Sequence, residues 1–211
     1  MAVKTARTTE RAYLDGPAEH ADDVWISTRF FTYHSDAGFV AGENITVKFV
    51  IDRPIGEVWP YASDWNTWMN PGGFYYSGVL GELEGQTFSL TLKPNDTETP
   101  HLYRVDKVIP EHLIVVSQPI FTDDDIKVYA GFPAYGGASG GYHVFMLAEH
   151  GGKTHVTVYM EHEAVMAKGA DTDTITVDKA LEPWREAAPV ATNRWRDEFI
   201  PTLKNLANET R

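Results

Sequence analysis

The sequence contains no cysteine in 211 residues. Disulfide bonds, thiolate metal sites and cysteine nucleophiles are therefore excluded. Basic residues are also scarce, because 18 lysines and arginines stand against 30 aspartates and glutamates, and the formal net charge is −12. This excess of acidic residues argues against nucleic acid or an anionic membrane surface as a partner.

Long apolar runs are missing as well. No stretch reaches the length of a membrane span, and the N-terminus MAVKTARTTER lacks the apolar centre of a signal peptide. We therefore expect a cytoplasmic protein with no membrane partner. Hydrophobic residues make up 43% of the chain and charged residues 23%, which is typical of one globular domain with an extension.

Several motifs of enzyme classes are absent from the sequence. There is no phosphate-binding loop, dinucleotide fingerprint or nucleophile elbow, so we expect no cofactor. Eight histidines are present, but no pair has the spacing of a zinc site. His155 and His162 lie in one predicted strand and point to its opposite faces, so we predict no metal site.

The most informative stretch is residues 45–69, ITVKFVIDRPIGEVWPYASDWNTWM. Its first part alternates as far as Ile51, which is typical of a strand with one buried face. Asp52 is placed to cap the next helix, and Pro54 suits the first turn of that helix. Helical spacing of apolar residues follows at Ile55, Val58, Trp59 and Ala62.

This order of elements resembles the opening of the SRPBCC superfamily, which includes START, Bet v 1-like and polyketide-cyclase-like proteins. In that superfamily a strand runs into a proline-led helix, and two short helices close one end of a cavity. The residues that carry the resemblance are Asp52, Pro54, Glu57, Val58, Trp59, Asp64, Trp65 and Trp68. The resemblance covers residues 44–208 and leaves residues 1–43 as an N-terminal extension. It implies an α+β helix-grip fold, in which a curved antiparallel sheet of about six or seven strands surrounds a long C-terminal helix.

Alternating residues predict the remaining strands at residues 74–76, 86–92, 101–109, 113–118, 142–149 and 153–163. Gly151 and Gly152 predict a two-residue hairpin turn in which His150 faces Lys153. The glycine-rich residues 119–141 predict a mobile loop, which is either a gate of the cavity or a surface loop without a role. A loop is also predicted over residues 164–172.

Both ends of the chain carry structure of their own. Residues 22–40 are too apolar for a free tail, and they either add a strand, cover the outside of the sheet or contact a second subunit of a homodimer. From Thr174 onward, apolar residues recur at intervals of three or four, which predicts a helix. Prolines interrupt this pattern, and we expect a kink or a break near Pro189.

The predicted hairpin places Glu161 on one face with Tyr159 and Tyr142. If this face lines the cavity, apolar walls raise the pKa of the Glu161 carboxyl and make it a usable acid or base. The opposite face is apolar apart from His143, and if that face lines the cavity, His143 is its polar group. The residues predicted to be catalytic are therefore Glu161, Tyr159 and His143.

Aromatic residues are the predicted ligand contacts, although aromatics at helical spacing also fit a core. They are Tyr142, Tyr103, Phe88, Trp65, Trp68, Trp184 and Trp195. Together with the resemblance, they favour a cofactor-independent lyase, cyclase or hydratase that acts on an aromatic or polycyclic hydrophobic molecule by acid–base catalysis. One alternative is a carrier that binds a hydrophobic ligand without turnover, and another is an adaptor of the chaperone-activator kind.

Overall fold

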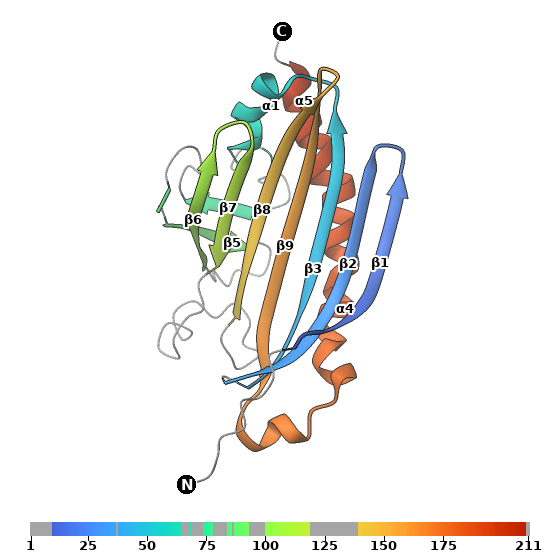
Figure 1. Ribbon diagram of the computed structural model, residues 1–211, viewed down its shortest axis with the longest axis vertical. Helices are drawn as coiled ribbons and strands as arrows, with labels where there is room; N and C mark the ends of the chain where they lie inside the picture. Colours follow the sequence, from blue (N-terminus) through green and yellow to red (C-terminus); the bar gives the residue numbers. More distant parts are fainter. Residues whose placement is uncertain are drawn as a thin grey trace.

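The computed structural model describes residues 10–36, 38–64, 68, 74–77, 84–85, 87–92, 100–118 and 139–209. For residues 74–77, 87–92, 100–103, 118 and 139–140 it describes the backbone only. These parts of the chain form one antiparallel sheet, and the C-terminal helices run along one side of it (Figure 1). This arrangement is a helix-grip fold, as predicted.

The sheet contains nine strands in the described part of the chain, and their spatial order is β1-β2-β3-β9-β8-β7-β6-β5-β4. The last seven in sequence, β3 to β9, form the predicted sheet. β9 continues to Ala167, so the loop predicted from Ala164 begins later. The strands are β1 Ala12–Ala21, β2 Val24–Ser35, β3 Gly38–Ile51, β4 Phe74–Ser77, β5 Thr87–Leu92, β6 Pro100–Ile109, β7 Leu113–Gln118, β8 Ser139–His150 and β9 Lys153–Ala167.

The first two strands come from the N-terminal segment, and they extend the sheet beyond β3 (Figure 1). Of the three roles considered for residues 22–40, the structure shows an added strand, because β2 pairs along its whole length with β3. The pairing of β1 with β2 shifts between Asp15 and Ala18, so Gly16 and Pro17 form a bulge. A Cβ atom at Gly16 would lie 2.8 Å from the Phe30 ring, which explains the glycine there.

The helix after β3 is α1 (Ile55–Ala62), as predicted, but its N-terminus is capped differently. Asp52 forms an ion pair with Lys153 instead of capping the helix. The carboxylate of Glu149, at the end of β8, accepts a hydrogen bond from the Ile55 N–H at 2.9 Å. A negative charge there also suits the positive end of the helix dipole.

The C-terminal helix does not break into two segments at Pro189, so that alternative is wrong. α4 (Val177–Arg194) passes through Pro189, and the irregularity comes later, in the π-helical turn η3 (Trp195–Phe199). α5 (Ile200–Glu209) then completes the helix, and a short 3-10 turn, η2 (Gly169–Asp173), precedes α4. Pro201 has no N–H and its ring crowds the carbonyl four residues earlier, which explains the wider turn directly before it.

Two apolar clusters lie between the sheet and these helices. The larger joins the inner face of β3, β7, β8 and β9 to η3 and α5, and it includes an aromatic group in which the rings of Trp68 and Trp195 are 5.7 Å apart. The smaller joins Phe30, Phe39 and Ala41 to α4. We call this face of the sheet the helix side and the opposite face the outer face. No helix in the described ranges is long and apolar enough to cross a membrane.

The turn between β8 and β9 is the predicted hairpin, and His150 pairs with Lys153. Gly151 and Gly152 have φ angles of +61° and +74°, a region that side chains disfavour. Gly152→Ala should therefore lower the free energy of unfolding by about 1 kcal/mol. Urea unfolding followed by circular dichroism measures this change.

Gly56→Ala is the matched control, because Gly56 lies in α1 and only the Glu111 side chain is within 4 Å of an added Cβ atom. This substitution should raise the free energy of unfolding by about 0.5–1 kcal/mol. If Gly152→Ala and Gly56→Ala changed the free energy of unfolding equally, the backbone conformation of Gly152 would not be the cause of its effect.

Candidate functional site

The hairpin register fixes which polar residues share a face. Tyr142 pairs with Glu161 and His143 with Met160, so the two sets of side chains predicted from the sequence are correct. The set with His143 packs against the helices, and Met160 and Val158 are buried there. Glu161, Tyr159 and Tyr142 therefore lie on the outer face. This corrects their placement in the cavity and leaves His143 as the predicted polar group on the helix side.

His143 belongs to a row of three polar side chains on the helix side, which we call the Glu43 chain. Nε2 of His143 lies 2.9 Å from Nε2 of His162 on β9. Nδ1 of His162 lies 3.5 Å from Oε1 of Glu43 on β3. Glu43 and His143 are 4% and 7% exposed, so both ends of the row are buried. Glu43 was missed in the sequence, although its signal is a single acid in the apolar alternation from Ala41 to Val47.

The Glu43 chain can carry a proton. Burial lowers the pKa of His143 well below its ordinary value, and the charge of His162 lowers it further, so His143 is neutral near pH 7. If His162 is doubly protonated, it donates to both Glu43 and His143. If His162 is neutral with its proton on Nδ1, His143 donates through Nε2 instead. A proton can therefore move between the two imidazoles while the Glu43 carboxylate stabilises the positive charge on His162.

Some buried polar atoms on β2, β3 and α4 lack a hydrogen-bond partner among the described residues. They are Oε2 of Glu43, Oγ1 of Thr28 on β2 and Oγ1 of Thr192 on α4. Thr28 pairs with Ile45 and so lies one row from Glu43 on the same face, whereas Thr192 lies on the buried side of α4. Buried polar groups in folded proteins are nearly always paired, so such atoms mark places for bound water or ligand.

The Glu43 chain interrupts the apolar packing at a definite place. On β3, Ala41 belongs to the smaller cluster and Ile45 to the larger, and Glu43 lies between them. The half-buried Trp184 packs on one side, and Trp195 is buried on the other. Within the described ranges no three His, Asp or Glu side chains are grouped to hold a metal ion. The arrangement suits an acid–base group beside apolar and aromatic walls.

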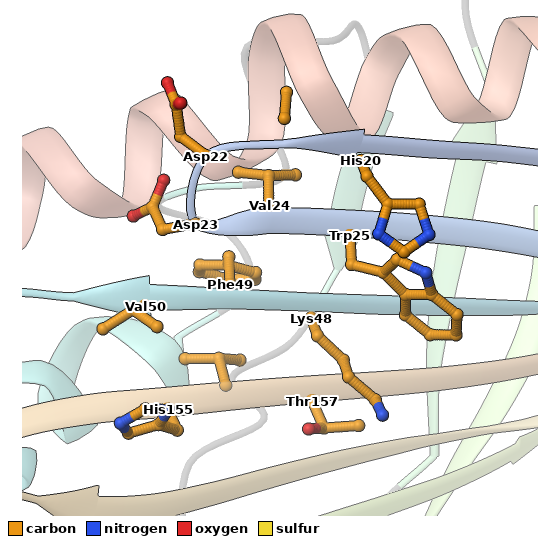
Figure 2. A pocket seen from close by; sticks show the side chains of 12 residues that line it. His20, Asp22, Asp23, Val24, Trp25, Lys48, Phe49, Val50, His155 and Thr157 are labelled. Carbon is orange, nitrogen blue, oxygen red and sulfur yellow. The ribbon is translucent and has the colours of Figure 1, made fainter.

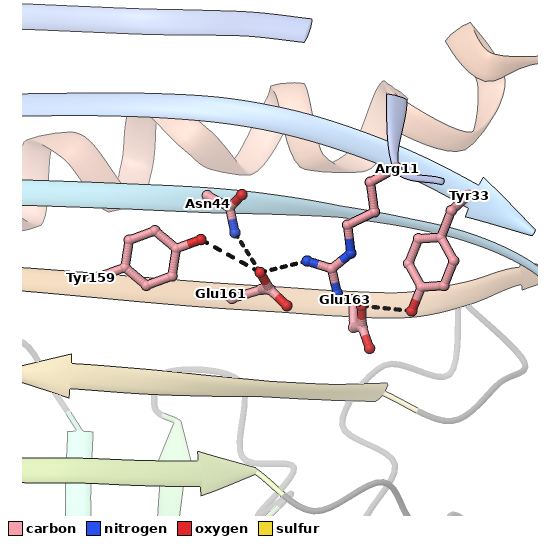
Figure 3. Close-up of polar contacts among 6 residues, drawn as sticks. All are labelled: Arg11, Tyr33, Asn44, Tyr159, Glu161 and Glu163. Carbon is pink, nitrogen blue, oxygen red and sulfur yellow. Dashed lines mark hydrogen bonds and ion pairs between the residues drawn. The ribbon is translucent and has the colours of Figure 1, made fainter. Parts of the chain in front are cut away.

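On the outer face, Glu161 is the centre of a second polar group (Figure 3). Arg11 precedes β1 and reaches across β2 and β3, and its guanidinium donates to Oε2 of Glu161 at 2.7 Å. The Asn44 amide donates to the same oxygen at 2.8 Å. Arg11 also lies over the rings of Phe31 and Tyr33, 4.5 Å and 5.2 Å from their centroids. These contacts give Oε2 of Glu161 a cationic and a neutral donor, as expected of a structural carboxylate.

The rest of this outer network is held in one protonation state. Tyr33 donates to Glu163 at 2.9 Å, and burial together with this bond raises the pKa of Tyr33 to about 12. Burial also raises the pKa of Tyr159, whose hydroxyl lies 3.5 Å from Glu161. Both tyrosines therefore stay protonated near pH 7. The network joins the N-terminal segment to β9, and its carboxylates already have donors.

A groove of about 370 Å³ also opens beside the β1–β2 turn (Figure 2). Its polar side chains include Lys48, whose ammonium lies 4.8 Å from the centroid of the Trp25 ring. His20 meets the same ring edge-on, at 5.7 Å between centroids. None of the groove's lining residues belongs to the Glu43 chain or to the outer network.

The other predicted ligand contacts have different outcomes. Trp68 is buried in the aromatic group of the larger cluster, and its indole N–H donates to the Ala62 carbonyl at 3.3 Å. Tyr142 is partly exposed on the outer face beside Tyr159. Trp65, the side chains of Tyr103 and Phe88, and residues 119–138 of the predicted gate lie outside the described parts.

No protein-family model matches the sequence, and no curated protein matches it. Among solved structures, protein MLL2253 from Mesorhizobium loti is similar at 16% identity, with 80% of this chain and 98% of that chain covered and a TM-score of 0.49. Norcoclaurine synthase from Thalictrum flavum, in complex with dopamine and hydroxybenzaldehyde, is 14% identical over 82% and 90% of the two chains, with a TM-score of 0.49. CalU16 from Micromonospora echinospora is 18% identical over 87% and 94%, with a TM-score of 0.40. Identities this low do not indicate a shared reaction or ligand.

Removing the guanidinium of Arg11 should destabilise the protein. Arg11→Met keeps apolar contact with Phe31 but leaves the buried Glu161 carboxylate without its cation. The free energy of unfolding should fall by about 2 kcal/mol, less than for a fully buried pair because the Arg11 side chain is 29% exposed. Urea unfolding measures this loss.

The double variant Arg11→Met, Glu161→Gln should be more stable than Arg11→Met alone, because it has no unpaired charge. Arg104→Met is the control, since Arg104 and Asp106 form an exposed pair, and its effect should stay below about 0.5 kcal/mol. A double variant no more stable than the single one would refute this account of Glu161.

His143 should make stability depend on pH. Its folded pKa lies below the unfolded value of about 6.5, so the unfolded chain binds more protons between these two values. The contribution of His143 is thus complete above about pH 6.5 and is lost as pH falls below it, by up to about 1.4 kcal/mol per pH unit. Urea unfolding between pH 5 and pH 8 measures the slope.

His143→Gln should remove this part of the slope. The difference in slope between wild type and variant is the quantity to compare, because it isolates the contribution of His143. His155→Gln replaces an exposed histidine and should leave the slope unchanged. Parallel curves for wild type and His143→Gln would mean that His143 is not held neutral by burial.

Proposed function

We propose that this protein binds an aromatic or other hydrophobic small molecule between the sheet and the C-terminal helices, and acts on it by acid–base catalysis at the Glu43 chain. The reaction class is that of a cofactor-independent lyase, cyclase or hydratase. The observation that carries the proposal is the row of Glu43, His162 and His143, which lies between two apolar clusters on the helix side.

The chemistry of the row supports a proton-transfer role. His143 is neutral near pH 7 and so is in the base form, and its lowered pKa means that it passes an accepted proton on to the hydrogen-bonded imidazole of His162 instead of keeping it. Glu43 stabilises the resulting charge from the far end, as a carboxylate does behind a catalytic histidine. Glu161 and Tyr159 are not included, because they lie on the outer face and Glu161 is paired with Arg11.

The principal alternative is a carrier for the same class of molecule. It is favoured by the small number of groups that could act in catalysis, since most of the helix side is apolar. In a carrier, the Glu43 chain would only hydrogen-bond the ligand. The two functions predict different effects of replacing His143: a catalyst should lose turnover, whereas a carrier should change only in affinity.

Native mass spectrometry of the purified protein, followed by denaturing extraction, should identify a bound aromatic or polyketide-like compound, and turnover of that compound can then be assayed. For a catalyst, His143→Gln should lower kcat by about 10²-fold or more while Kd stays within about tenfold. His155→Gln is the matched control and should change neither constant.

A change in Kd alone would support the carrier, and so would an extracted lipid or fatty acid with no turnover. Full turnover by His143→Gln would refute catalysis at the Glu43 chain.

A further inference from the structure

Two buried carboxylates lie on neighbouring strands and on opposite faces of the sheet. Glu43 of β3 and Glu161 of β9 are both 4% exposed. Glu161 receives hydrogen bonds from Arg11 and Asn44 on one oxygen. Glu43 has His162 beside Oε1, and its Oε2 has no partner among the described residues. Glu43 therefore keeps a carboxylate oxygen that a ligand can bind, whereas Oε2 of Glu161 already accepts two hydrogen bonds.

Among the residues that the structure describes, the ion-pair partner of Glu43 is His162, and no lysine or arginine is paired with Glu43. None of the buried residues that the structure describes is lysine or arginine. Arg185 on α4 is exposed and pairs with Asp178, and Lys204 on α5 pairs with Asp23. A ligand carboxylate placed beside Glu43 would therefore meet a like charge in a site of low dielectric, with only His162 to compensate.

We infer that Glu43 selects the ligand of the proposed site: an apolar or aromatic molecule bearing a hydroxyl or ammonium group, which donates a hydrogen bond to Oε2, with carboxylates rejected. This inference rests on the proposed function. A buried acceptor left unpaired costs more than the bond it would form, so a ligand without a donor also binds more weakly.

Naphthyl compounds test this with one ring system and four substituents. Naphthol, naphthylmethylamine, methylnaphthalene and naphthoate are titrated into the full-length protein at pH 7.5, and Kd is measured by calorimetry. Histidine side-chain NMR signals report whether binding occurs at His143 and His162. Naphthol and the amine should bind at least about tenfold more tightly than naphthoate, with methylnaphthalene between them.

Two matched variants separate Glu43 from charge in general. Glu43→Gln should bring naphthol and naphthoate to within about threefold of each other. Glu161→Gln makes the same change on the outer face and should keep the tenfold preference. The comparison of Kd values among the ligands uses only the wild-type protein, so it tests ligand selection by Glu43 even if Glu43→Gln does not fold.

The outcomes separate the two proposals. Naphthoate binding as tightly as naphthol to the wild type would overturn the role of Glu43 and leave the proposed function standing. An equal loss of preference in Glu43→Gln and Glu161→Gln would also overturn that role. If no probe binds, or if binding leaves the signals of His143 and His162 unmoved, the proposed site fails and this inference fails with it.

Discussion

The pairing of β9 with its two neighbours is the constraint on which the site depends. Glu43 pairs with His162 across β3 and β9, while Asn44 pairs with Glu161 one residue further along. A slip of one residue would carry every side chain of β9 to the other face. The positive φ angles of Gly151 and Gly152 hold this register at the hairpin turn.

The two faces of the sheet use the same chemical group in different ways. On the outer face, the negative charge of Glu161 is neutralised by Arg11. This ion pair attaches the N-terminal segment to β9. On the helix side, Glu43 is joined to two imidazoles and keeps one oxygen without a described partner. A paired carboxylate contributes to stability or specificity of folding, whereas a partly paired one can still bind or exchange a proton.

The sequence was sufficient to predict strands β3 to β9, the hairpin pairing and the C-terminal helix, because each follows from local alternation or spacing. It was not sufficient to predict β1, since residues 12–21 are mostly exposed and contain few large apolar side chains. Nor was it sufficient to show which face of β9 meets the helix. Tyr159 and Tyr142 suggested a cavity, yet the outer face is also partly covered, because Arg11 and Phe31 lie over it. Proline spacing predicted a kink or a break near Pro189, but the helix is continuous there and widens into a π-helical turn before Pro201 instead.

The bulge in β1 has a consequence for how the molecule meets others of its kind. β1 is the outermost strand on its side of the sheet, and an unpaired strand edge invites pairing with another chain. Gly16 and Pro17 interrupt the regular ladder in the middle of that edge, and proline offers no N–H there. The hairpin of β1 and β2 thus enlarges the sheet, and the bulge in β1 prevents a further strand from pairing regularly with this edge. This protects the edge from edge-to-edge aggregation.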